Sequence, residues 1–212
     1  MAEHQPGRDC PLCPRLVSFR EMQRAAHPDW HNAPVPSFGD LNARLLIVGL
    51  APGLKGANCT GRPFTGDYAG DLLYATLLKF GYAQGHYDER PDDSLTLRDC
   101  RITNAVRCVP PENKPLPIEQ SACRPFLVNE IAAMPKLKAI VALGLVSHNA
   151  VLSTLGERKA AFPFKHAALH EVSKGLLVAD SYHCSRYNTN TGRLTTEMFE
   201  NVFERLSERL GR

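Results

Sequence analysis

The chain lacks any apolar run long enough to cross a membrane, since a spanning helix needs about 20 apolar residues. It also lacks an apolar signal segment near its start, so we expect a cytoplasmic protein with no membrane partner. No internal repeat and no low-complexity tract is present. The net charge of +3 is small, and it permits a nucleic-acid partner without arguing for one. No Gly-Lys-Ser or Gly-Lys-Thr follows the first apolar run, which excludes a Walker-type phosphate loop.

Length and apolar content favour one folding unit. A chain of 212 residues with 43% hydrophobic residues can bury a sizeable core within one domain. We expect residues 1–212 to form a single monomeric domain in which residues 1–40 are an N-terminal extension.

Apolar runs alternate with amphipathic segments along the chain. The pattern predicts strands at residues 45–48, 99–106, 137–144 and 176–179, and helices at residues 16–26, 71–80, 118–134, 145–155 and 195–210. Apolar strands that alternate with helices form a parallel sheet covered on both faces. We therefore expect an α/β fold, a three-layer αβα sandwich around a four-stranded, mainly parallel central sheet.

Three loops that follow predicted strands hold most of the polar and glycine residues of interest, namely residues 49–67, 104–117 and 181–193. In parallel α/β sheets, ligands bind at the carboxyl ends of the strands, where such loops meet. The first loop is long and rich in glycine and proline, which lets the backbone approach a ligand closely. We expect these loops to form one binding site.

His183 lies just past a predicted strand end, among serine, asparagine and arginine residues. A histidine in that position can donate a hydrogen bond or a proton to a leaving group. Cys184 follows directly, but adjacent residues of an extended segment point in opposite directions. A Cys–His catalytic pair is therefore not expected here.

Seven cysteines in a chain without a signal segment favour metal binding or free thiols over disulfides. Cys10 and Cys13 form a Cys-x2-Cys pair, and a second pair, Cys108 and Cys123, lies far along the chain. Cys10 precedes every predicted strand, which argues against a thioredoxin-like dithiol. Four thiolates of this kind suit a tetrahedral zinc ion or a [4Fe–4S] cluster. On spacing alone, Cys100 could take the place of Cys108.

Together, four segments resemble the uracil-DNA glycosylase superfamily. They are Gly-Leu-Ala-Pro-Gly at residues 49–53, Thr-Gly-Arg-Pro-Phe-Thr-Gly-Asp at 60–67, Ile-Thr-Asn-Ala-Val-Arg-Cys at 102–108, and Ser-Tyr-His-Cys-Ser-Arg-Tyr-Asn at 181–188. The chain is most similar to the iron–sulfur branch, and within it to the family 5 (type B) enzymes of bacteria and archaea. The resemblance extends from Cys10 to about Leu194.

This resemblance implies a structural [4Fe–4S] cluster held by Cys10, Cys13, Cys108 and Cys123, two of which belong to the extension. It also implies that Phe64 stacks on a base flipped out of the duplex and that Asn104 reads the base edge. His183 would stabilise the departing base anion. The implied base pocket further includes Gly49, Ala51 and Gly53, and the implied DNA-contacting segment is Ser185, Arg186, Tyr187 and Asn188. Either Arg186 or Tyr187 would fill the gap left by the flipped nucleotide.

The sequence departs from better-known relatives at the water-activating position. Leu50 and Ala51 stand where other branches carry an acidic residue, and the resemblance points to Asp67 instead. Asp67 also suits an N-cap of the following helix, and the two roles are compatible. Gly53 stands where uracil-specific relatives carry a tyrosine, which predicts a broader substrate range.

The implied function is hydrolysis of the N-glycosidic bond of uracil in double-stranded DNA, and of other deaminated bases such as hypoxanthine and xanthine. Two alternatives remain at this stage. One is a metal-stapled nucleic-acid-binding protein that has lost catalysis, for which Leu50 and Ala51 are the argument. The other is a zinc-dependent hydrolase, which needs histidine or carboxylate ligands near the pocket.

Overall fold

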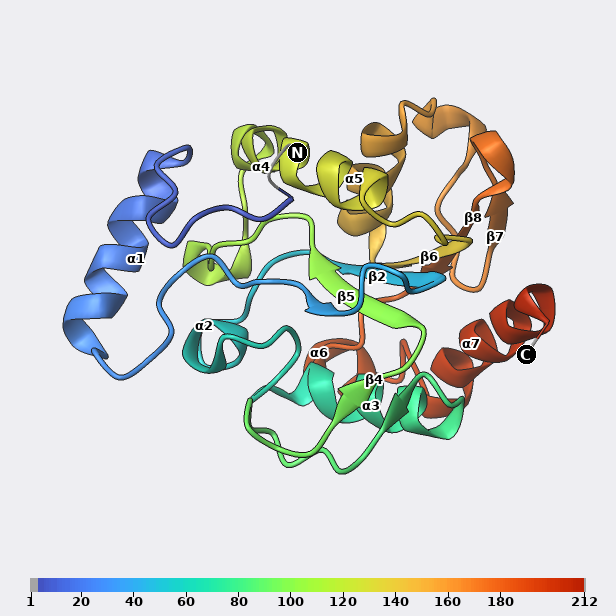
Figure 1. The fold of residues 1–212 in the computed structure, drawn as a ribbon, viewed down its shortest axis with the longest axis horizontal. Helices are drawn as coiled ribbons and strands as arrows, with labels where there is room; N and C mark the ends of the chain where they lie inside the picture. Colours follow the sequence, from blue (N-terminus) through green and yellow to red (C-terminus); the bar gives the residue numbers. More distant parts are fainter. Residues whose placement is uncertain (1–3, 212) are drawn as a thin grey trace.

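A six-stranded sheet forms the centre of the structure, a computed structural model that describes residues 4–211 (Figure 1). The strand order is β1-β5-β2-β6-β8-β7, with four parallel inner strands and two antiparallel edge strands. The strands are β1 (Phe38–Gly39), β2 (Leu45–Gly49), β5 (Cys100–Asn104), β6 (Ala139–Leu143), β7 (Leu169–Glu171) and β8 (Leu177–Ser181). The predicted α/β class with a mainly parallel sheet is confirmed. The predicted count of four strands is wrong, because two short, part-exposed edge strands carry too few residues for a periodic signal.

The α-helices within residues 4–211 are α1 (Pro14–Ala26), α2 (Ala57–Thr60), α3 (Tyr68–Lys79), α4 (Pro117–Ala132), α5 (Leu145–Leu155), α6 (Arg186–Asn190) and α7 (Thr196–Leu210). Helices α3, α4, α5 and α7 cover the two faces of the sheet. A small separate hairpin pairs β3 (Ala83–Gln84) with β4 (Thr96–Leu97). Within residues 4–211, no helix is long and apolar enough to cross a membrane.

Strand β2 shows how the layers form, because its alternate side chains point to opposite faces. Leu45 and Ile47 pack with residues of α3 and α7, whereas Leu46 and Val48 pack with residues of α4 and α5. Figure 1 shows α4 and α5 on one side of the sheet and α3 and α7 on the other. All residues of β2 are buried, which explains its continuous apolar sequence.

Helix α1 lies at one end of the molecule (Figure 1) and is joined to the body by a small core and an ion pair. The core contains Leu16, Val106 and Cys123. Arg15 donates from Nε and from one terminal nitrogen to the two carboxyl oxygens of Glu119, both at 2.8 Å. The N-terminal segment is thereby held next to the chain that follows β5.

A buried charged cluster joins β7 and β8 to α5. His148 Nδ1 lies 2.6 Å from Asp180 Oδ1, and His170 Nε2 lies 2.9 Å from Asp180 Oδ2. His148 Nε2 lies 2.9 Å from the carbonyl oxygen of Phe162. Two ligands of one zinc ion lie about 3.3 Å apart at ordinary bond lengths, whereas these atoms lie at hydrogen-bond distances from one another. These contacts form a hydrogen-bond network that joins the three elements.

Candidate active site

A cavity of about 750 Å³ opens where β2, β5 and β8 end. Its lining comes mainly from the loops after these three strands, as the sequence predicts. Residues 50–57, 64 and 66–69 follow β2, Asn104 ends β5 and Asn113 follows it, and His183, Ser185 and Arg186 follow β8. The three predicted loops therefore meet in one site.

Gly49 ends β2 next to Leu50 of the cavity lining, and its lack of a side chain lets two other side chains come close to the strand. A Cβ at Gly49 would overlap Asn104 Oδ1 and would lie 2.6 Å from Cζ of Phe64. Asn104 is 3% exposed, and its Oδ1 is buried without a hydrogen-bond partner. A buried polar atom left unpaired is costly and calls for a ligand or a function. The Asn104 amide is thus available to a ligand in the cavity.

Phe64 presents an aromatic ring next to Asn104. The side chain is buried, and its ring centroid lies 6.1 Å from that of His183. Its backbone adopts a left-handed conformation with φ of 52°, which is rare for a bulky residue. The rings of Phe64 and His183 together form an aromatic wall that suits a flat ligand.

His183 is half-buried and lines the cavity. Burial lowers the pKa of its imidazole to about 4. The ring is therefore neutral near pH 7 and carries one N–H. The Asn188 side chain donates to the His183 carbonyl oxygen at 2.8 Å, which fixes the backbone at this point.

Asp67 lies at the end of the loop that follows β2, against the backbones of Gly53 and Gly56. A Cβ on Gly53 would lie 2.9 Å from Asp67 Oδ2, and a Cβ on Gly56 would overlap that oxygen. Asp67 occupies the N-cap position of α3, but its side chain makes no capping hydrogen bond and its Oδ1 is buried without a partner. Burial raises the pKa of this carboxyl above that of an ordinary aspartate. The free oxygen can accept a hydrogen bond from a water molecule.

The segment after His183 is a short helix, α6, where a loop was predicted. Ser185 caps it by accepting from the amide of Asn188 at 3.4 Å. The Arg186 guanidinium lies over the Tyr68 ring at 5.3 Å, whereas Tyr187 is 72% exposed. Ser185 and Arg186 thus belong to the cavity rim, Asn188 supports the backbone, and Tyr187 projects into solvent.

Cys184 takes no part in this site. Its side chain is fully buried in the core beneath the sheet, and burial strongly raises the pKa of its thiol. The thiol therefore stays protonated at neutral pH, and Cys184 lies outside the cavity lining to which His183 belongs.

A second, much smaller cavity is lined by Cys10, Cys13, Cys108 and Cys123. Two groups donate toward its sulfurs: the Arg20 guanidinium lies 3.8 Å from Cys108 Sγ, and the Arg107 amide lies 3.4 Å from Cys123 Sγ. Cys100 lies elsewhere, fully buried within the core that β5 shares with α3.

Several cavity residues were not predicted from the sequence as site residues, among them Lys55, Tyr68 and Asn113. Lys55 is exposed at the mouth, and Asn113 has a left-handed φ of 57° in the turn that follows β5. Only the position of each residue within or beside a predicted binding loop could have indicated it.

Comparison with known proteins identifies the family of the chain. Residues 36–207 match the model of the family described as the uracil DNA glycosylase superfamily. A Type-5 uracil-DNA glycosylase of Thermus thermophilus is 47% identical over 91% of this chain and 90% of its own length. A protein of the same name from Pyrobaculum aerophilum is 41% identical over 96% of this chain and 90% of its own length. A Type-4 uracil-DNA glycosylase of Pyrobaculum aerophilum is 35% identical over 73% of this chain and 65% of its own length. The chain therefore belongs to the uracil-DNA glycosylase superfamily, and within it to the type-5 family.

Proposed function

We propose that the protein is a monofunctional, monomeric DNA glycosylase that hydrolyses the N-glycosidic bond of uracil in double-stranded DNA and leaves an abasic site. The proposal is supported mainly by one observation: Asn104, whose Oδ1 has no hydrogen-bond partner, lines the same cavity as the Phe64 ring and the neutral His183. A base inside a duplex cannot be reached, so an enzyme of this kind extrudes the nucleotide into a pocket.

Recognition of the base rests on Phe64 and Asn104. A base stacked on an aromatic ring gains about 1–3 kcal/mol, which offsets part of the cost of unstacking. The Asn104 amide offers both a donor and an acceptor to the polar edge of the base. Its buried Oδ1 has no protein partner, so binding a base N–H restores a hydrogen bond that the free protein lacks.

In the reaction, the bond between the base nitrogen and C1′ breaks and its electron pair leaves with the base. Positive charge develops on the sugar, and a water oxygen then bonds to C1′ and gives up a proton, while the base anion takes up a proton and leaves as the neutral base. His183 donates its N–H to an oxygen of the departing base, where negative charge develops. The neutral form of His183 can do this across the range from pH 5 to 8, because burial lowers its pKa to about 4.

Asp67 is the proposed acceptor for the attacking water. We expect Asp67→Ala to slow single-turnover release of uracil about tenfold, equivalent to about 1.4 kcal/mol in the barrier. Protonation of Asp67 should remove the acceptor for the water and lower the rate at acidic pH. Because burial raises the pKa of Asp67, this loss should begin at a higher pH than the pKa of an ordinary aspartate would give. The rate of Asp67→Asn should not show this decrease at acidic pH. A wild-type rate for Asp67→Ala would show that backbone groups alone hold the water.

The proposed substrate range includes hypoxanthine and xanthine as well as uracil. Gly53 supports this proposal, since it lines the cavity without a side chain, and the Asp67 carboxylate lies where a side chain at this position would begin. Excision by the wild-type protein from a panel of duplexes with uracil, hypoxanthine, xanthine or mispaired thymine tests it. Release of uracil alone would restrict the substrate range and leave the main proposal standing.

The contact with DNA is proposed to use both sides of the cavity mouth. Tyr187 is the better candidate to fill the gap left by the flipped nucleotide, because it is 72% exposed and unstacked, whereas Arg186 lies over Tyr68. Arg186 and the exposed Lys55 are then suited to contact phosphates.

A [4Fe–4S] cluster is the proposed occupant of the cysteine cavity, which ties the extension over residues 1–40 to the rest of the domain. Within residues 4–211, one group of three histidine, cysteine or acidic residues has its ligand atoms within 4.8 Å of one another, and it consists of His148, His170 and Asp180. No three of the cysteine sulfurs in that range lie so close together. Sulfurs that bind one zinc ion lie about 3.8 Å apart. The sulfurs of the four cysteines are spread more widely, which favours a [4Fe–4S] cluster over a single zinc ion. Donors such as Arg20 are typical of groups that hydrogen-bond to cluster sulfurs. When bound, the cluster supplies a structural crosslink, and no step of the reaction is assigned to it.

Absorption provides a direct test of the cluster. We expect the purified protein to be brown, with a broad band near about 400 nm, and Cys123→Ser to lose that band because it removes one thiolate ligand. Cys100→Ser is the matched control and should keep the band, since Cys100 lies in a different core. A colourless wild-type protein that contains zinc would contradict the proposal.

The competing function is a DNA-binding protein of the same fold without catalysis. Leu50 and Ala51, which line the cavity without acidic groups, are the observation in its favour. A zinc-dependent hydrolase is not supported, because the cluster of His148, His170 and Asp180 does not line the cavity and its atoms bond to one another.

A further inference from the structure

The loop that carries Phe64 is built on a strained backbone. Within residues 61–66, Gly61, Phe64 and Gly66 all have positive φ, of 77°, 52° and 82°. A left-handed conformation costs a non-glycine residue about 1–2 kcal/mol. Such strain persists only where the surrounding structure enforces it, and it is concentrated at functional sites.

Two tyrosine hydroxyls hold the carbonyl groups on either side of the strained residue. Tyr74 donates to the Pro63 oxygen at 2.6 Å, and Tyr87 donates to the Phe64 oxygen at 3.2 Å. Gly70 of α3 lies directly beneath, where a Cβ would overlap both the Phe64 oxygen and the Tyr87 hydroxyl. Each of these contacts fixes the peptide groups that set the direction of the Phe64 ring.

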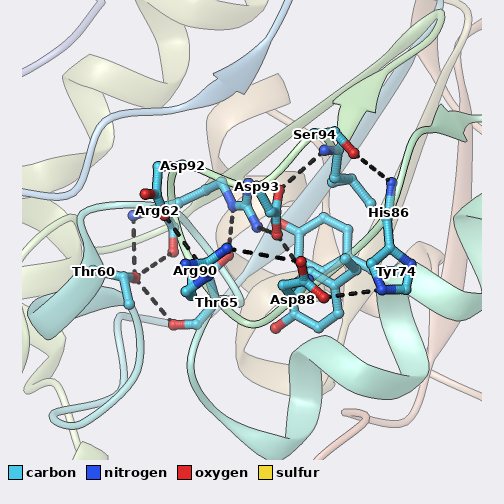
Figure 2. A network of polar contacts seen from close by, with 12 residues as sticks. Thr60, Arg62, Thr65, Tyr74, His86, Asp88, Arg90, Asp92, Asp93 and Ser94 are labelled. Carbon is cyan, nitrogen blue, oxygen red and sulfur yellow. Dashed lines mark hydrogen bonds and ion pairs between the residues drawn. The ribbon is translucent and has the colours of Figure 1, made fainter.

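Behind the tyrosines lies a buried ion pair. The Arg62 guanidinium donates to both oxygens of Asp93 at 2.7 Å, and the two side chains are 6% and 0% exposed (Figure 2). Asp93 also accepts the amides of Asp88 and Leu95, both at 3.0 Å, and Arg62 holds the pKa of Asp93 down to about 2. Arg62 Nε donates to Thr65 at 2.8 Å, which ties the pair to the strained loop.

The same guanidinium orders the tyrosines. Arg62 lies 5.5 Å from the ring centroid of Tyr74 and 5.7 Å from that of Tyr87, and the two rings lie 4.6 Å apart. Desolvation makes a buried ion pair a poor source of net stability compared with apolar side chains of the same size. The ion pair of Arg62 and Asp93 is therefore better explained by its effect on the geometry of the loop and the tyrosines than by a contribution to net stability.

We propose that Arg62, Asp93 and Tyr87 form a positioning clamp that presets Phe64 in the orientation in which its ring receives the flipped base. The clamp does not touch the base, and it acts through Phe64. This inference rests on the proposed glycosylase function, and it adds residues that lie outside the cavity lining.

The test is a double-mutant cycle between Tyr87→Phe and Phe64→Ala, measured as kcat/KM for uracil release from a duplex. Tyr87→Phe keeps the ring and removes one hydrogen bond, so we expect a loss of about fivefold. In the Phe64→Ala background the same change should have no further effect, because the group on which the clamp acts is gone. A purely structural role would give additive losses in the cycle, and additive losses would overturn the proposal.

Two further measurements separate this proposal from the proposed function. In the free protein, Tyr87→Phe should speed hydrogen exchange of the amides in residues 62–67, and unchanged exchange would overturn the clamp whatever the activity. Binding to a duplex with a fluorinated, uncleavable deoxyuridine should weaken about fivefold in Tyr87→Phe even if the wild type proves inactive. Arg90→Ala is the matched control, since it removes only exposed ion pairs of the same segment and should change neither measurement.

Asp93→Asn is the second variant, because it keeps the shape of the side chain and removes its charge. It leaves the Arg62 guanidinium buried without an ionised partner, so we expect a larger loss of kcat/KM than for Tyr87→Phe. If Asp93→Asn does not fold, the decision rests on Tyr87→Phe, which preserves the buried ion pair.

Discussion

Replacing His183 with alanine is expected to lower the single-turnover rate of uracil release about 100- to 1,000-fold, the usual effect of removing one donor aimed at developing negative charge. The ring lines the cavity beside Phe64, at 6.1 Å between centroids, and burial keeps it neutral with its pKa lowered to about 4. Binding of the duplex should change far less than the rate, because the donor acts on the charge that appears only as the bond breaks.

His86→Ala is the control for this prediction, since His86 lies in an exposed pair with Asp88 away from the cavity. It should release uracil at the wild-type rate. A rate within a few-fold of wild type for His183→Ala would contradict the role assigned to His183.

The buried state of His183 also predicts a pH dependence of stability. A folded-state pKa of about 4 lies below the ordinary value of 6.5, so the unfolded chain binds more protons between these values. The contribution of His183 to the free energy of unfolding is therefore lost as the pH falls from 6.5 towards 4. His183→Ala should be less sensitive to pH across that window in thermal unfolding.

Gly49→Ala should abolish most activity although it adds a single methyl group. The backbone of Gly49 has no left-handed conformation, so alanine is allowed there on conformational grounds. Its Cβ would overlap Asn104 Oδ1 and approach Cζ of Phe64 to 2.6 Å, so both side chains that we propose to contact the base must move. A displacement of about 1 Å in a reacting geometry can cost about 100-fold in rate, and we expect a loss of that size.

Thermal unfolding and cluster absorption of Gly49→Ala show whether the protein remains folded. Gly7→Ala is the control, because a Cβ at Gly7 meets nothing within 4 Å, and it should behave as wild type. Full activity in Gly49→Ala would mean that Asn104 and Phe64 do not bind the base from their present positions.

The sequence predicts the inner part of the fold well because the inner strands are buried on both faces. β2 and β6 are continuous apolar runs, and their buried residues leave a clear signal. The edge strands β1 and β7 are two and three residues long, and part of each is exposed, so neither the period nor the composition marks them. Short helices such as α6 are also not predicted, because they contain too few residues to show a helical period, although Ser185 is a good N-cap residue.

The position of the cavity follows from the order of the strands, because parallel strands end at the same edge. The loops that hold Phe64, Asn104 and His183 could therefore be brought together from the sequence alone. The clamp behind Phe64 could not be predicted in this way. Asp93 and Tyr87 lie in a polar segment between the short strands β3 and β4, and only the folded structure places them against Arg62.

Release of free uracil from a double-stranded oligonucleotide with one central uracil is the most direct test of the proposed function. With the wild-type protein in excess, we expect a single-exponential release of uracil and an equal amount of abasic strand, which alkali then cleaves. An intact strand after prolonged incubation, together with tight binding to the same duplex, would show that the protein binds DNA without acting on it.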